Sequence, residues 1–142
     1  MQIKDIMKTD VKTTGPRSTV QKAAEEMSDY RIGCLVVVKK ERMVGIITER
    51  DILTRLVAEN LSASKTKVED IMTTKVVMIE PERDVTDAAE IMTTRKIKKL
   101  PVISNDHLAG IVTLFDICAV EPSLIKKVAS LMMLPKKKII AG

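Results

Sequence analysis

Aromatic residues are nearly missing from this sequence, which has one Tyr, one Phe and no Trp among 142 residues. Apolar residues still make up 45% of the chain, as in globular proteins, so the core must be aliphatic. The sequence has a single histidine and shows no nucleophile with a base in reach. Its two cysteines, Cys34 and Cys118, are far apart in sequence and form no C-x-x-C pattern. We expect both cysteines to be small buried hydrophobic residues, and we expect no metal site and no enzyme activity.

Long hydrophobic runs are also lacking. Runs such as Leu35–Val38 are too short to cross a bilayer. The first residues, Met1-Gln2-Ile3-Lys4-Asp5, do not have the cationic and apolar regions of a signal peptide. We therefore expect a cytoplasmic protein that has no membrane partner.

The net charge of +5 comes from one end of the chain. Basic and acidic residues cancel over residues 1–122, and the excess consists of Lys126, Lys127 and the Lys136–Lys138 run. Nucleic acid attracts basic surfaces, so this tail is the only part of the sequence that favours such a partner. A lysine run is more often a solvated end than a binding site.

The chain contains an internal repeat. The segment Gly45–Asp51 has the pattern G-h-h-T-x-x-D, where h is an apolar residue, and it returns 65 residues later as Gly110–Asp116. The same shift, without gaps, aligns Asp-Ile-Met openings, prolines, an Ala-Ala-Glu segment and strand-like apolar residues over about fifty positions. The pairs include Asp5 with Asp70, Pro16 with Pro81, Ala23 with Ala88, Met27 with Met92, Leu35 with Leu100, and Ile52 with Ile117.

Each copy predicts the series β-α-β-β-α, an α/β fold of the α+β type. Ser18-Thr19 and Asp84 are the expected helix caps. The expected hairpins are Cys34–Lys39 with Met43–Thr48, and Leu100–Ser104 with Leu108–Thr113. The second helices are expected over Glu49 to about Asn60 and over Leu114 to about Val120. We divide the chain into repeat 1 (residues 1–61), a polar linker (62–68), repeat 2 (69–121), and a C-terminal helix with a basic tail (122–142).

The glycine segments have two interpretations. In the structural one, Thr48 with Asp51 and Thr113 with Asp116 form helix capping boxes. In the functional one, a strand leading into a helix N-terminus presents backbone N–H groups to a phosphate, and the aspartate accepts hydrogen bonds from a ribose diol. Spacing alone favours the capping box.

The repeat order, the Asp-Ile-Met openings, Leu100-Pro101-Val102 and the two glycine segments together resemble a tandem pair of CBS domains, the regulatory module named after cystathionine β-synthase. The resemblance covers residues 1 to about 120. It implies two copies packed through their sheets with pseudo-two-fold symmetry, and clefts that bind AMP, ADP, ATP or S-adenosylmethionine. It also implies a homodimer. The ligand would be regulatory, with no cofactor required.

Several nucleotide-binding residues follow from the resemblance. Asp51 and Asp116 would bind ribose, Thr48 and Thr113 would contact phosphate or ribose, and the opposite copy would contribute residues of its opening segment and the residue before its second strand. Arg50 aligns with Phe115, and Gly33-Cys34 aligns with Lys98-Lys99, so we expect unequal affinities. The complete candidate set is Thr9, Gly33, Thr48, Arg50, Asp51, Thr74, Lys98, Lys99, Thr113 and Asp116. Exposed loop lysines are an equally good interpretation of Lys98 and Lys99.

Two functions remain open from the sequence. The leading hypothesis is a stand-alone adenosine-sensing module that signals to an effector protein. The alternative is a nucleic-acid-binding or scaffolding protein that uses the basic tail, whose binding would weaken with salt and disappear on removal of residues 134–142. The electrically neutral body and the scarcity of aromatic residues argue against base recognition. The sole histidine, His107, is expected to be an exposed loop residue.

Overall fold

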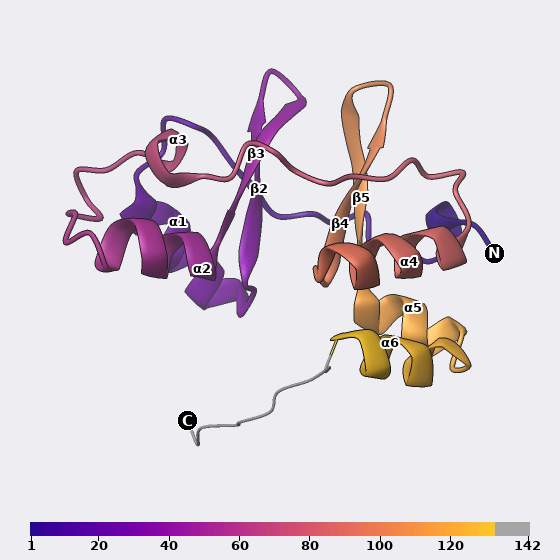
Figure 1. Ribbon diagram of the computed structural model, residues 1–142. Coiled ribbons are helices and arrows are strands. Elements are labelled where there is room, and N and C mark those ends of the chain that lie inside the picture. The colour runs from indigo at the N-terminus through magenta and orange to yellow at the C-terminus, as the bar shows by residue number, and fades with distance from the viewer. Residues whose placement is uncertain (133–142) are drawn as a thin grey trace. The chain divides into compact units, whose positions relative to one another are not determined.

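The structure is a computed structural model that describes residues 1–132 (Figure 1). These residues form two compact units. Unit 1 contains Met1–Thr9, Met78–Val102 and the described residues from Ala109 onward, and unit 2 contains Asp10–Val77 and Ile103–Leu108. We call residues 1–9 of repeat 1 and residues 69–77 of repeat 2 the opening segments. Each opening segment therefore belongs to the unit that contains most of the other repeat. Lys136–Lys138, the proposed basic tail, lies outside the described residues.

Unit 2 has the predicted β-α-β-β-α series. Its elements are β1 (Thr13–Thr14), α1 (Val20–Tyr30), β2 (Cys34–Lys39), β3 (Arg42–Thr48), α2 (Glu49–Asp51), a π-helical segment η2 (Ile52–Val57) and α3 (Val68–Ile71). β1 pairs in parallel with β2, and β2 pairs antiparallel with β3. The second helix expected to run to about Asn60 is thus a short α-helix that continues as a π-helix and ends at Val57.

The second repeat supplies most of unit 1. The elements of repeat 2 are α4 (Val85–Arg95), β4 (Lys99–Ser104), β5 (His107–Thr113) and α5 (Leu114–Val120). Unit 1 also contains η1, a 3-10 turn near the start of the chain (Ile3–Asp5), and α6 (Leu124–Met132), which follows repeat 2. The tip of the β4–β5 hairpin, Ile103–Leu108, is grouped with unit 2, where His107 pairs with Arg42. His107 is exposed, as expected.

The first strand of repeat 2 is reduced to a single bridge. Ile79 pairs in parallel with Val102, as Thr14 pairs with Val37 in repeat 1. In repeat 1 the residue before Thr14 is also paired: Thr13 pairs with Val36, and the Val36 N–H donates to the Lys12 carbonyl at 3.3 Å. Pro101 occupies the position equivalent to Val36 and has no N–H, so this second bond cannot form.

The first helix of each repeat begins and ends at equivalent residues. Thr19 caps α1 by accepting a hydrogen bond from the Lys22 N–H at 3.2 Å, and Asp84 caps α4 by accepting one from the Thr86 N–H at 3.0 Å. The hydrogen bonds from the Thr86 side chain and backbone lower the pKa of Asp84. Both predicted caps are confirmed, and both helices end at a left-handed residue, Arg31 or Lys96.

The core is aliphatic, as the composition requires. In unit 2 the buried cluster joins α1, β2, β3, η2 and α3; it consists of Val20, Ala23, Met27, Leu35, Val37, Ile47, Leu56, Val68 and Ile71. The equivalent stripe of α4 in unit 1 is buried at all four predicted positions, Val85, Ala88, Ala89 and Met92. Cys34 is buried as expected, whereas Cys118 is only half-buried, and both are thiols. Across residues 1–132, no helix is both long enough and apolar enough to span a bilayer.

The glycine of each motif lies against an opening segment. Ile46 and Thr73 exchange two backbone hydrogen bonds of 2.9 and 2.8 Å, and Ile111 and Lys8 exchange two of 2.9 Å. A Cβ added to Gly45 would lie 2.8 Å from the Thr73 carbonyl oxygen, and one added to Gly110 would lie 2.7 Å from the Lys8 carbonyl oxygen. These backbone contacts require glycine, because no side-chain rearrangement relieves them.

We therefore predict that Gly45→Ala and Gly110→Ala each lower the free energy of unfolding by about 1–3 kcal/mol, as overpacking does. Chemical denaturation measures this change. Gly15→Ala is the control, because its added Cβ would meet only the Ser18 Oγ at 4.0 Å and should not destabilise the protein. Wild-type stability of both motif variants would contradict the close-approach explanation.

Candidate functional site

Both glycine motifs form the predicted capping boxes. The Thr48 N–H donates to Asp51 Oδ2 at 3.1 Å, and the Asp51 N–H donates to Thr48 Oγ1 at 3.1 Å. Thr113 and Asp116 repeat this arrangement at 3.0 and 3.1 Å. The structural interpretation is therefore confirmed. Each capping box also holds its aspartate carboxylate in a fixed position where a strand ends and a helix begins.

The residue before β2 or β4 is tied to the same helix start. The Glu49 N–H donates to the Gly33 carbonyl at 2.9 Å, and the Leu114 N–H donates to the Lys98 carbonyl at 2.8 Å. Two of the first three N–H groups of each helix are thus used within the protein. A phosphate docked at either helix N-terminus would have fewer backbone donors than the motif alone suggests.

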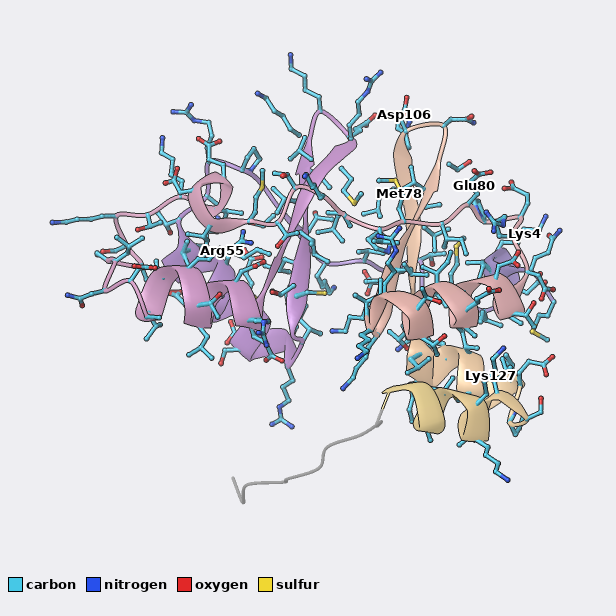
Figure 2. The ribbon with its side chains drawn as sticks, in the orientation of Figure 1. Lys4, Arg55, Met78, Glu80, Asp106 and Lys127 are labelled. Carbon is cyan, nitrogen blue, oxygen red and sulfur yellow. The ribbon has the colours of Figure 1, made fainter. Side chains whose placement is uncertain are left out.

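Asp51 has a nearly complete set of internal partners. Its side chain is 8% exposed. The Thr73 hydroxyl lies 3.0 Å from Oδ1 and 3.2 Å from Oδ2, and Arg55 Nε lies 3.9 Å from Oδ1. Arg55, labelled in Figure 2, also donates to the carbonyls of Ile71 and Met72 at 3.1 Å each. It thereby holds the opening segment of repeat 2 beside this carboxylate.

Asp116 is less enclosed. Its side chain is 13% exposed, and beyond its capping box it pairs with Lys8, whose Nζ lies 3.7 Å from Oδ1. Lys8 aligns with Thr73 in the repeat and is itself 65% exposed. Val120 occupies the position equivalent to Arg55. The second aspartate therefore has an exposed, flexible cation where the first has a hydroxyl and a guanidinium group.

The opening segments reach the aspartates through residues that the sequence did not single out. Thr73 and Lys8 make the contacts, whereas the candidates Thr74 and Thr9, one position later, are exposed. Arg55 was also missed. The repeat alignment pairs Thr73 with Lys8, but only the bridge to β3 or β5 shows which residue of each segment faces the carboxylate.

The other candidates lie apart from these contacts. Arg50 and Lys98 are exposed, and Lys99 is half-buried and makes an interaction of its own. Phe115, which aligns with Arg50 but was not a candidate, is also exposed. Lys98 and Lys99 belong to unit 1 and Asp51 to unit 2, so the contribution of these lysines to a nucleotide cleft stays a prediction. Among residues 1–132, no group of three or more His, Cys, Asp or Glu side chains is arranged to hold a metal ion.

We predict that Thr73→Val lowers the free energy of unfolding by about 1–3 kcal/mol, because it removes a hydroxyl donor from a buried carboxylate. Thermal or chemical denaturation measures the loss. Thr74→Val is the matched control at an exposed position and should change stability by less than about 0.5 kcal/mol. Equal effects of the two substitutions would show that the Thr73 hydroxyl does not support Asp51.

Comparison with known proteins identifies the family of this chain. A family model described as the CBS domain matches residues 3–58 and 68–122. The CBS domain-containing protein YhcV of Bacillus subtilis is 35% identical over 115 residues, which are 81% of each chain. Inosine-5'-monophosphate dehydrogenase of Methanocaldococcus jannaschii is 35% identical over 115 residues, 80% of this chain but 22% of the enzyme.

Among solved structures, the CBS domain pair of protein MJ0100, in complex with 5'-methylthioadenosine and S-adenosyl-L-methionine, superposes with a TM-score of 0.76 and 29% identity. The match covers 87% of this chain and 97% of that one. The two segments that match the CBS-domain family model, residues 3–58 and 68–122, correspond to the two repeats, and each contains one of the capping boxes.

Proposed function

The chain belongs to the CBS-domain family as a tandem pair, and we propose that it is a stand-alone regulatory module that binds adenosine-type ligands and signals to a partner protein. The observation that carries this proposal is the pair of fixed carboxylates, Asp51 and Asp116, one at the helix start of each repeat. A carboxylate accepts hydrogen bonds and suits the vicinal hydroxyls of a ribose.

The similar MJ0100 pair supports an adenosine ligand. Its complex contains 5'-methylthioadenosine and S-adenosyl-L-methionine, and both of these compounds carry a ribose. AMP, ADP and ATP share the adenosine portion and add phosphates. We propose that ribose recognition is common to all these ligands, and that the surrounding cations decide whether phosphates are accepted.

We further propose that the Asp116 site binds ligand more tightly than the Asp51 site. At Asp116 a ribose hydroxyl needs to displace only the exposed Lys8 ammonium, 3.7 Å from Oδ1. That ammonium can then turn to a phosphate, because a lysine side chain has several rotatable bonds. At Asp51 the ligand must replace the Thr73 hydroxyl, which contacts both carboxylate oxygens. Losing that contact reduces the net gain from binding.

Regulation requires that the ligand has different affinities for two states of the protein. The opening segments are suited to carry such a change, because Lys8 and Thr73 each touch an aspartate and also hydrogen-bond a strand. We propose that ligand binding shifts these segments, and that an effector protein recognises the shift. We place the protein in the cytoplasm, as a homodimer without enzymatic activity of its own.

We predict that calorimetric titration with AMP, ADP, ATP, S-adenosylmethionine and 5'-methylthioadenosine detects binding of at least one ligand. Asp116→Asn should weaken that binding about ten- to hundredfold, as expected for hydrogen bonds to a charged group. A ligand that binds only the folded state should also raise the melting temperature.

The matched control for this titration is Asp106→Asn. Asp106, labelled in Figure 2, is an exposed hairpin-turn residue with a φ of 66°, a conformation that asparagine tolerates well. This variant should bind like the wild type. Absence of heat with all five ligands would contradict the proposed function, and unchanged affinity of Asp116→Asn would contradict the role of that carboxylate.

A further inference from the structure

Arg55 joins the glycine motif of repeat 1 to the end of α3. Its Nη1 donates to the carbonyls of Ile71 and Met72 at 3.1 Å each, and its Nε lies 3.9 Å from Asp51 Oδ1. Ile71 is the last residue of α3, and Met72 is its C-cap. Carbonyls at a helix C-terminus lack intrahelical partners, and a basic side chain satisfies them well. Arg55, labelled in Figure 2, therefore completes the end of α3 beside a buried carboxylate.

The contact with Met72 fixes the position of Thr73. The Met72 carbonyl and the Thr73 N–H belong to one peptide group. The carbonyl accepts a hydrogen bond from Arg55 Nη1, and the N–H donates to the Ile46 carbonyl at 2.8 Å. Both sides of this peptide group are thus bound, and the adjoining Thr73 hydroxyl lies 3.0 Å from Asp51 Oδ1. Loss of the Arg55 contact would free one side of the peptide group that carries Thr73.

Repeat 2 lacks this arginine. Its glycine motif meets an opening segment through the same reciprocal backbone hydrogen bonds, those of Ile111 with Lys8. Val120 stands at the position equivalent to Arg55, and a valine side chain donates no hydrogen bond. The turn that carries Arg55 is π-helical, whereas the aligned residues up to Val120 lie in the α-helix α5; π-helical turns recur at functional sites. The arginine contact is therefore a difference between the two sites rather than a common part of the repeat.

The Arg55 contact bears on the access of a ligand to Asp51. The Asp51 side chain is 8% exposed, and the Thr73 hydroxyl contacts both of its carboxylate oxygens. A ribose diol needs those same oxygens, so the state that binds ligand is one in which Thr73 has moved away. The apparent affinity of a ligand falls with the population of the state that can bind it. Any contact that keeps Thr73 in place therefore weakens binding at this site.

We propose that Arg55 is a positioning residue that keeps the Asp51 site closed in the free protein. It holds the Met72 peptide group, which places Thr73 on the aspartate, and an adenosine-type ligand binds once this segment withdraws. The inference rests on the proposed function for the identity of that ligand. The same movement releases the end of α3, so occupancy of the Asp51 site changes the contacts of the opening segment of repeat 2.

The first test is amide hydrogen exchange of the ligand-free full chain with Arg55→Val, which gives repeat 1 the residue of repeat 2. The Thr73 and Ile46 amides, which join the opening segment to β3, should exchange at least about tenfold faster than in the wild type. The Lys8 and Ile111 amides form the matching pair in unit 1 and should keep their rates. Unchanged rates at Thr73 and Ile46 overturn the proposal. Equal acceleration of both pairs also overturns it, because that would mean a general loss of stability.

The second test is calorimetric titration with 5'-methylthioadenosine, which carries a ribose and no phosphate, so that its binding reports on the aspartate. Asp116→Asn serves as the background, in which the heat comes from the Asp51 site. Arg55→Val should tighten binding in that background about five- to twentyfold, because it raises the population of the open state. A purely structural role of Arg55 would not tighten binding. Unchanged or weaker binding overturns the proposal.

Two further variants complete the test. Arg17→Val makes the same substitution at an exposed arginine before α1 and should change neither the exchange rates nor the affinity. Arg55→Lys keeps a cation with three N–H donors at this place and should leave the affinity within about threefold of the background. Tightening as large as that of Arg55→Val would overturn the proposal. If no adenosine-type ligand binds any variant, that result contradicts the proposed function, and the exchange rates decide the role of Arg55.

Discussion

The structure depends on the close approach of an opening segment to each glycine motif. Two reciprocal backbone hydrogen bonds join Ile46 to Thr73, and two join Ile111 to Lys8. Gly45 and Gly110 permit this approach because a Cβ would collide with a carbonyl oxygen. The same contact exchanges the opening segments between the repeats, and it brings a polar side chain of one repeat to the aspartate of the other.

The capping box and the proposed ligand site are one structure with two uses. A carboxylate that accepts a backbone N–H is held in place, and it keeps lone pairs for further donors. At Asp51 those lone pairs meet Thr73 and Arg55, and at Asp116 they meet Lys8. The two repeats therefore share the geometry of the motif, and a few neighbouring residues that differ between them make the two carboxylates chemically different.

Much of the fold was predictable because its signals are local or repeated. Thr19 and Asp84 act as helix caps through short-range hydrogen bonds, and Asn105-Asp106, with positive φ at both residues, forms the turn of the second predicted hairpin. Because the 65-residue shift aligns the two repeats without gaps, each helix or strand predicted in one repeat was supported by its counterpart in the other. The π-helical continuation of α2 was not predictable, since its residues follow an ordinary helical pattern. The loss of a strand beside Pro101 became visible only with the pairing partner known.

The sequence by itself determined the repeat, the family resemblance, the aliphatic core and the two Thr–Asp capping boxes, because these follow from residue type and spacing along the chain. Tertiary structure alone decided that Thr73 and Lys8, rather than Thr74 and Thr9, reach the aspartates, and that Arg55 contacts both Asp51 and the end of α3. The physical reason is that these contacts join residues distant in sequence. Side chains alternate in direction along an extended segment, so a difference of one position decides which of them meets its partner.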